Sequence, residues 1–274
     1  MAATPGRLTG HMDDWRSYDD VAETYERVHA SRFVQVADDL VAQAGIGEGQ
    51  LLLDIGTGTG IAAEAATKVG ARVVGIDESM GMLHVARRQR PAEAVAAAEA
   101  IDLPFRDSVF DAAIGSFVLA HFTKYETAIF DAMRVLKVGG TIGFSSWSDG
   151  VDAYQTAWTE LVESVVPREI LEPAYAEARP WHDKFRKRDQ IEEVLIDAGL
   201  RHVRTEIRKY RWVYGREEYI DGMSVFASGR FVREMLGASG WDAFRARASA
   251  VFAERFPDPL NDFREVILST AVKV

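Results

Sequence analysis

Hydrophobic residues between positions 13 and 44 recur every third or fourth position, which is the spacing of one face of a helix. Val21, Tyr25 and Val28 begin this series, and Gly45 follows its end. The pattern predicts a helical segment in two pieces before the first strand.

From residue 51 onward, short continuous apolar runs alternate with helical stretches. The runs predict strands at 51–55, 72–77, 94–98, 110–117 and 141–147. Helices are expected at 61–69, at 79–90 and at 125–136, the last ended by Gly139-Gly140. Strands that alternate with helices in this way indicate an α/β fold, with a parallel sheet covered by helices on both faces.

The alternation lapses after residue 150. A helical stretch at 151–180 is expected to break at Pro167, Pro173 and Pro180. Further on, the pattern predicts a helix at 189–198, a strand at 203–214, helical structure at 216–256 and a final strand at 266–274. We therefore divide the chain into an N-terminal helical lid (13–44), a core (45–150), a cap insertion (151–186), a core helix and strand (187–215), a second cap insertion (216–262) and the last core strand (263–274).

Composition narrows the choice of partners. The formal net charge of −10 argues against nucleic acid or an anionic membrane surface, since both are bound mainly through Lys and Arg. The chain has no cysteine, which excludes disulfides and thiolate sites and fits a cytoplasmic protein. No apolar run is long enough for a membrane span, and the first residues lack the apolar core of a signal peptide.

A glycine-rich loop follows the first expected strand, with the sequence Asp54-Ile55-Gly56-Thr57-Gly58-Thr59-Gly60. Such a loop allows a ligand to approach the backbone at a helix N-terminus, although on its own it is equally compatible with a structural turn. Ile61 stands where the dinucleotide fingerprint has its third glycine, and no Gly-Lys-Ser/Thr follows, so neither a nicotinamide cofactor nor a P-loop is indicated. The Asp54 carboxylate would repel a pyrophosphate but suits a ligand with a cationic amino group.

Asp77 ends the second expected strand, 21 residues after Gly56. A carboxylate at this position can accept hydrogen bonds from ribose hydroxyls. It could instead cap the helix that begins near Ser79. The glycine loop and Asp77 together favour a ligand that contains ribose.

Four motifs in order now identify a family resemblance. They are Leu52-Leu53-Asp54-Ile55-Gly56-Thr57-Gly58-Thr59-Gly60, Val74-Gly75-Ile76-Asp77, Asp102-Leu103-Pro104-Phe105-Arg106-Asp107 leading to Phe110-Asp111, and Leu136-Lys137-Val138-Gly139-Gly140. The chain resembles class I S-adenosylmethionine-dependent methyltransferases of the ubiquinone and menaquinone C-methyltransferase type, over 15–150 and more loosely over 185–214. It departs from them at Val138, where the family usually has proline. The resemblance implies a doubly wound, Rossmann-like sheet of seven strands, mostly parallel with the last strand antiparallel.

The same resemblance implies roles for residues in the cofactor site. Gly56, Thr57, Gly58 and Gly60 would surround the methionine part, Asp54 would contact the amino group and Asp77, followed by Glu78, would take the ribose. Met82, or the neighbouring Ser79 and Met80, would flank the adenine. Glu99 would accept from the adenine amino group with Ala100 and Ile101 beside it, although a solvated loop acid is an alternative. The backbone of Ser116 would meet the ligand.

The acceptor side is less defined. His121 could be a general base with a pKa suited to neutral pH, or a packing residue that starts the next helix. Tyr18 is the first candidate for a lid over the cofactor, while Tyr25 could equally belong to the core. The other histidines show no metal-site spacing, so no metal is expected. The basic run that contains Lys184 and Arg186 could face an acidic substrate group or simply be solvated.

Aromatic residues are frequent from the end of the core onward, and twelve of them could pack the cap or line a pocket for a bulky acceptor. They are Trp147, Tyr154, Trp158, Tyr175, Trp181, Trp212, Tyr214, Tyr219, Phe226, Phe231, Trp241 and Phe244. We expect methyl transfer to a small lipophilic acceptor, with carbon methylation of a terpenoid, polyketide or quinone as the favoured hypothesis. A cyclase that binds the same cofactor, or a non-catalytic binding module, is the alternative. An oligomer formed through the N-terminal helices is left open.

Overall fold

Seven strands form one sheet in the computed structural model, which describes residues 14–90 and 94–274. They are β1 (Leu51–Ile55), β2 (Arg72–Asp77), β3 (Ala94–Ala97), β4 (Phe110–Ser116), β5 (Leu136–Trp147), β6 (Arg201–Tyr214) and β7 (Leu260–Val272). The strand order is β3-β2-β1-β4-β5-β7-β6. The first five strands are parallel, and β7 runs antiparallel to both of its neighbours. This confirms the expected seven-stranded, doubly wound, Rossmann-like fold.

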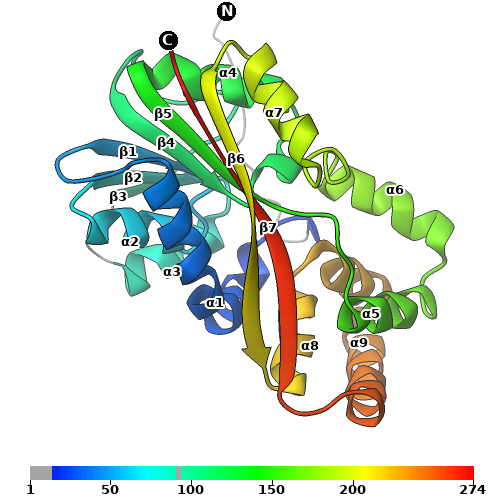
Figure 1. Cartoon of the computed structure of the whole chain (residues 1–274). Coiled ribbons are helices and arrows are strands. Elements are labelled where there is room, and N and C mark those ends of the chain that lie inside the picture. The colour runs from blue at the N-terminus through cyan, green and yellow to red at the C-terminus, as the bar shows by residue number, and fades with distance from the viewer. Residues whose placement is uncertain (1–13, 91–93) are drawn as a thin grey trace, which may run out of the picture.

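Helices cover both faces of the sheet (Figure 1). The elements are η1 (Asp19–Val21), α1 (Ala22–Gln43), α2 (Ile61–Lys68), α3 (Met80–Gln89), η2 (Leu119–His121), α4 (Tyr125–Val135), α5 (Ala153–Glu163), α6 (Arg168–Ala178), α7 (Arg188–Asp197), α8 (Arg216–Ser224) and α9 (Ala227–Arg255). Side chains of α1 and α2 fill one hydrophobic core, and those of α4 and α7 fill the core on the opposite face. Residue 13, the first of the expected N-terminal segment, lies outside the described residues.

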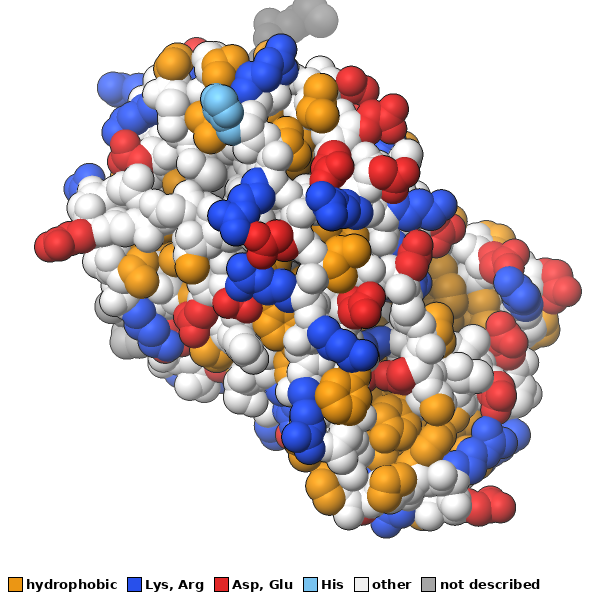
Figure 2. Space-filling view, viewed as in Figure 1, with side chains coloured by type: hydrophobic (Ala, Val, Ile, Leu, Met, Phe, Trp, Pro, Cys, Tyr) orange, Lys and Arg blue, Asp and Glu red, His pale blue; other side chains and the backbone are white. Residues whose placement is uncertain are grey.

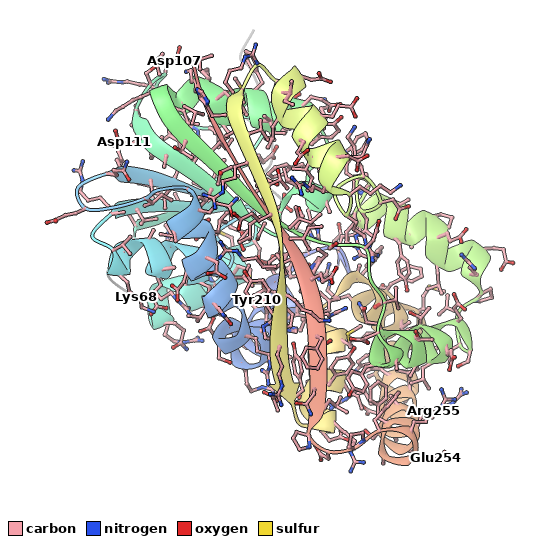
Figure 3. The ribbon with its side chains drawn as sticks, viewed as in Figure 1. Lys68, Asp107, Asp111, Tyr210, Glu254 and Arg255 are labelled. Atoms are coloured by element: carbon pink, nitrogen blue, oxygen red, sulfur yellow. The ribbon has the colours of Figure 1, made fainter. Side chains whose placement is uncertain are left out.

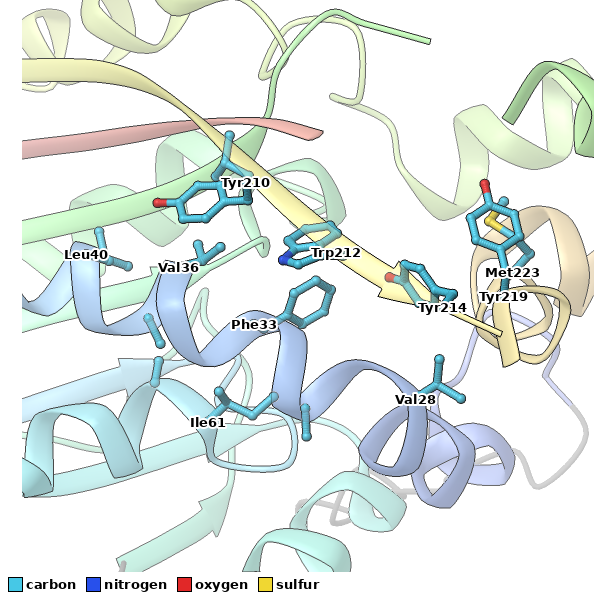
Figure 4. Close-up of a cluster of buried hydrophobic side chains, with 14 of the residues drawn as sticks. Val28, Phe33, Val36, Leu40, Ile61, Tyr210, Trp212, Tyr214, Tyr219 and Met223 are labelled. Carbon is cyan, nitrogen blue, oxygen red and sulfur yellow. The ribbon is translucent and has the colours of Figure 1, made fainter. Parts of the chain in front are cut away.

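Helix α1 is part of the structural core. Phe33, Val36 and Leu40 lie on the face that packs toward Tyr210 and Trp212 of β6 (Figure 4). Full burial of each large apolar side chain contributes about 1.5–3 kcal/mol. Helix α1 therefore covers the sheet and does not form part of the lid expected at 13–44; a lid formed by the residues before α1 stays a prediction.

The antiparallel pair of β6 and β7 extends beyond the rest of the sheet (Figure 1). Trp147 at the end of β5 pairs with Val266, whereas β6 continues to pair with β7 as far as Tyr214 and Leu260. The last strand thus begins before residues 263 and 266, the expected starts, because its first residues pair with β6 alone. This extension carries the sheet into the region of α5, α8 and α9.

Two expectations about helix ends are wrong. Gly139 and Gly140 lie inside β5, because α4 ends at Val135 and the chain enters the strand directly. Pro173 lies inside α6 and does not break it. Leu171 and Ala174, on either side of the proline, are buried in the core, and this packing holds the helix together despite the lost backbone hydrogen bond.

The face shown in Figure 2 carries intermixed acidic and basic side chains, with hydrophobic side chains gathered over its lower half. Figure 1 places β7, α5, α8 and α9 in that half. Among the helices of residues 14–90 and 94–274, none is both long and apolar enough to cross a membrane.

Candidate cofactor and acceptor site

Asp54 occupies the carboxyl end of β1 and is completely buried. Its Oδ2 accepts a hydrogen bond from the Thr57 hydroxyl at 2.7 Å, while Oδ1 makes no hydrogen bond of normal geometry. Burial raises the pKa of this carboxyl to about 7, and the bond from Thr57 opposes that shift. Besides Thr57, the backbone N–H of Ala63 also opposes the rise in pKa, yet Oδ1 keeps hydrogen-bonding capacity that a cationic group could use.

Asp77 joins the glycine loop to the start of the next helix. Its carboxylate accepts hydrogen bonds from the backbone N–H of Gly58 at 2.8 Å and of Ser79 at 2.9 Å. The side chain that caps α3 is that of Ser79, which accepts from Met82 N–H. Burial raises the pKa of Asp77 to about 6, and these backbone bonds oppose the shift. Asp77 thus holds the loop and α3 in place while keeping further lone pairs for a ligand.

The glycines of the loop have different roles. Gly56 has a φ of 67°, and a Cβ there would lie 2.6 Å from the Val118 side chain, so packing requires glycine. Gly58 has a φ of 56°, and a Cβ there would meet no atom within 4 Å. The space beside Gly58 is therefore open at the edge where Asp54 and Asp77 lie. Gly60 precedes α2 as its N-cap residue.

The remaining expected cofactor residues also follow the ends of these strands. Glu78 and Glu99 are exposed. Burial, and next to it the negative charge of Glu99, raises the pKa of Glu78, so the residues that follow β2 and β3 lie near one another. Ala100 and Ile101 are half-buried beside them. Met82 is buried and packs near Tyr18 and Tyr25. Ser116 ends β4, and its Oγ lies 2.9 Å from that of Ser145.

Asp19, which the sequence did not suggest, joins the segment before α1 to the start of α3, beside Asp77. Its Oδ1 accepts from the Ser79 hydroxyl and from Gly81 N–H, both at 2.7 Å. A Cβ on Gly81 would lie 2.4 Å from the Asp19 carbonyl oxygen, so the two segments are in close contact. No local sequence signal predicts this contact, because its partners are about 60 residues apart.

Tyr18 lies between a cation and a histidine. The Arg230 guanidinium stands 3.9 Å from the centre of the Tyr18 ring, and the His121 ring lies 5.9 Å away. Arg230 is buried in α9 and also donates to the carbonyl oxygen of Trp15 at 2.8 Å. A residue far along the chain thus anchors the segment that carries Tyr18.

His121 differs from the expectation of a near-neutral pKa. Burial, followed by the charges of Arg179 and Arg230, lowers its pKa to about 3. The imidazole is therefore neutral at pH 7 and is a weaker base than an ordinary histidine. A role of His121 as general base stays a prediction, and its lowered pKa makes it a weak proton acceptor.

The backbone is strained where β4 ends. Phe117 has a φ of 56°, a conformation that costs a bulky residue energy. Its N–H donates to the Ser145 carbonyl oxygen at 3.0 Å, and its ring stacks on Trp147 at 4.4 Å. This stack links the end of β4 to Trp147, which lines a cavity beside the end of β5.

A cavity of about 550 Å³ lies between the end of β5, the extension of β7 and helices α5 and α6. Its aromatic lining consists of Trp147, Trp158, Tyr175, Phe226 and Phe263. Most of the other aromatic residues of the cap are buried as packing: Trp212, Tyr214, Tyr219, Phe231, Trp241 and Phe244. Most of these aromatic residues therefore pack the cap, and others line a cavity; that this cavity binds the acceptor stays a prediction.

From the basic run, Arg186 lines this cavity, whereas Lys184 lies over the ring of Tyr125 at 5.3 Å. Among the residues that the structure describes, no group of three or more His, Asp or Glu side chains is arranged to hold a metal ion.

Comparisons with known proteins agree with this geometry. Residues 53–144 match the family described as "Methyltransferase domain". The demethylmenaquinone methyltransferase of Renibacterium salmoninarum is 33% identical over 199 residues, which cover 66% of this chain and 81% of that protein. The demethylmenaquinone methyltransferase of Paenarthrobacter aurescens is 32% identical over 199 residues, which cover 66% of this chain and 76% of that protein.

Solved structures share the fold. Phosphoethanolamine N-methyltransferase 2 of Haemonchus contortus, solved with S-adenosyl-L-methionine, aligns with a TM-score of 0.57 at 19% identity. The alignment covers 93% of this chain and 57% of that one. The cyclase SpnF aligns with a TM-score of 0.55 at 19% identity, over 94% and 97% of the two chains. At this level of identity, the likeness concerns the fold alone.

Proposed function

Because the chain belongs to the S-adenosylmethionine-dependent methyltransferases and uses S-adenosylmethionine as its cofactor, we propose that it methylates a small lipophilic acceptor of the quinol type in the cavity beside β5. The observation that carries this proposal is the position of the aromatic cavity. Its Trp147 stacks on Phe117, the residue that directly follows Ser116 at the end of β4.

The residues at the strand ends fit the cofactor. The unused Oδ1 of Asp54 suits the amino group, Asp77 suits the ribose hydroxyls, and the open space at Gly58 admits a ligand against the backbone. Bound there, the cofactor supplies an activated methyl group. Glu78, Met82, Glu99, Ala100, Ile101 and Ser116 stay proposed contacts around these three.

The protein's own contribution is alignment and exclusion of water. Tyr18 and the residues before α1 would close the site, held by Arg230 and by Asp19. The aromatic walls would face an acceptor ring and favour positive charge that develops on it. An electron-rich carbon of a quinol is the proposed methyl acceptor, in line with the names of the relatives.

The test uses cofactor labelled in its methyl group and 1,4-naphthohydroquinone as the acceptor probe. Mass spectrometry should find one labelled methyl on a ring carbon of the product. A labelled ether would contradict carbon methylation. Conversion of an acceptor without label would favour the cyclase, and ligand binding without any turnover would favour the binding module. Cytoplasmic location and an oligomer stay predictions.

A further inference from the structure

The cationic side chains that line the cavity differ in how they are neutralised. Arg168 pairs with Glu172 at 2.6 Å, Arg186 with Asp149 at 3.2 Å and Arg264 with Asp262 at 3.1 Å. Lys209 is exposed, and its Nζ lies over the ring of Phe263 at 5.5 Å from the ring centre. Arg179 lines the same cavity and forms no ion pair with any carboxylate of the described residues.

Arg179 is half-buried in the wall of the cavity. It follows α6 as the C-cap residue, and its Nε is buried without a hydrogen-bond partner. Its guanidinium lies 5.9 Å from the centre of the Tyr175 ring, which also lines the cavity. Shielding a cation from water without a counter-ion is costly, so the half-buried guanidinium of Arg179, whose Nε is enclosed, leaves a place for an anion.

The groups that face Arg179 do not neutralise it. Tyr18 and Tyr175 are uncharged phenols, whereas Arg186 and Arg230 add positive charge. Burial, and next to it the charge of Arg179, lowers the pKa of His121 and of His182 to about 3. Both rings are therefore neutral at pH 7. Among the described arginines that line the cavity, Arg179 is the one without a carboxylate partner.

We propose that the quinol-type acceptor also carries a carboxylate on its aromatic ring, and that this carboxylate binds Arg179. A carboxylate matches the fork of the guanidinium and forms charge-assisted hydrogen bonds to it. The aromatic lining holds the ring of the same molecule, with Trp158 and Phe226 among its members. This inference rests on the proposed function in taking the cavity as the acceptor site, and it narrows the acceptor to one chemical class.

The test compares two probes of nearly the same shape, the anionic 1-hydroxy-2-naphthoate and the neutral 1-hydroxy-2-naphthamide. Calorimetry on the full chain, with S-adenosylhomocysteine present, gives the dissociation constant of each. The wild type should bind the acid at least about tenfold more tightly, as expected for a charge-assisted pair. Equal affinity for the two probes, or no measurable binding of the acid, would overturn the proposal.

Variants then assign the preference to one residue. Arg179→Gln should bind both probes equally, while Arg179→Lys should keep part of the preference for the acid. Arg168→Gln is the matched control, because it removes an exposed arginine of the same cavity that already has a carboxylate partner. A preference for the acid that survives in Arg179→Gln, or that disappears in Arg168→Gln, would contradict the assignment.

Methyl transfer is measured separately with labelled cofactor. If the acid is preferred through Arg179 but no acceptor is methylated, the proposed function fails while the anion site stands. If the quinol probe is methylated but the acid has no advantage in binding, the anion site fails and the proposed function stands.

Discussion

The carboxylate of Asp19 accepts a hydrogen bond from the hydroxyl of Ser79 at 2.7 Å, although 60 residues separate the two in sequence. This bond ties the segment before α1 to the N-terminus of α3, two residues after Asp77. Burial would raise the pKa of Asp19, but the bonds from Gly81, Ser79 and Ser17 outweigh it and lower the pKa. The carboxylate is therefore ionised at neutral pH and complements the positive end of the helix.

Replacing this carboxylate should loosen the N-terminal segment. Asp19→Ala removes bonds to Ser79 and Gly81, each worth about 1 kcal/mol, and we expect a loss of about 1–2 kcal/mol in the free energy of unfolding. Urea denaturation measures it. Asp20→Ala, at the exposed neighbouring position, should change stability by less than about 0.5 kcal/mol. Equal effects of the two substitutions would contradict a specific role for Asp19.

Asp77 should determine cofactor affinity. Asp77→Ala leaves the N–H groups of Gly58 and Ser79 without their acceptor and removes the proposed ribose contacts, so affinity should fall at least about tenfold. Calorimetry with S-adenosylhomocysteine measures this affinity. Asp107→Ala is the control, because Asp107 lies at the opposite, upper edge of the sheet in Figure 3. An unchanged affinity in Asp77→Ala would refute the ribose assignment.

The open space at Gly58 can be tested by comparing a substitution there with the same substitution at Gly45, where the backbone strain is similar. Gly58→Val and Gly45→Val each force a β-branched residue into a left-handed conformation, since φ is 56° and 67° and neither Cβ meets an atom within 4 Å. Both should lower the melting temperature to a similar extent. Gly58→Val alone should abolish cofactor binding, because its side chain enters the ligand space. If both variants bind the cofactor, the loop is only a turn.

Cofactor affinity should depend on pH through Asp54. With a pKa of about 7, its carboxyl is ionised above pH 7 and loses the charge that attracts an amino cation as the pH falls. Affinity should therefore decrease by about tenfold from pH 8 to pH 6. Asp54→Asn should bind weakly with no such dependence, and a flat wild-type profile would contradict the assignment.

The same raised pKa values act on the stability of the ligand-free protein. The folded state binds protons at Asp54 and Asp77 more tightly than the unfolded state, whose carboxyls have a pKa of about 4. Their contribution to stability is therefore present below pH 4 and is lost as the pH rises through about 7. The ionised carboxylate of Asp54 is the form that attracts the amino cation of S-adenosylhomocysteine. Scanning calorimetry should therefore show that this ligand raises the melting temperature more at pH 8, where Asp54 is ionised, than at pH 5.5, where it is protonated.

Tyr18 should matter for turnover more than for cofactor binding. Tyr18→Ala removes the ring that packs against Arg230 and His121, and we expect kcat to fall at least about tenfold while cofactor affinity changes by a few-fold. Tyr18→Phe keeps the ring and should retain most of the activity. Full activity in Tyr18→Ala would contradict a role for Tyr18 in closing the site.

The sequence alone predicted the elements of the core and the edge where the site lies, because both depend on local patterns. The run 51–55, the glycine loop and Asp77 each carry their signal within a few residues. Prolines and glycines near helix ends were less informative. Pro173 remains inside α6, since the burial of Leu171 and Ala174 outweighs the local preference.

Contacts between distant segments could not be predicted. Asp19, Arg179 and Arg230 gain their roles only when helices far apart in the sequence meet. The sequence gives His121 an ordinary pKa, whereas burial and two arginines shift it in the folded protein. Such shifts follow from three-dimensional packing, which a single sequence does not encode locally.

The place of β7 in the sheet has a consequence for synthesis of the chain. β7 pairs with β5 and β6, both of which precede it. Tyr210, labelled in Figure 3, lies in the middle of β6 and pairs with Arg264 of β7. A nascent chain that ends before Leu260 therefore has two strand edges without their partner. Until those residues leave the ribosome, the two edges can pair with other chains, and chaperone demand should be greatest at this stage.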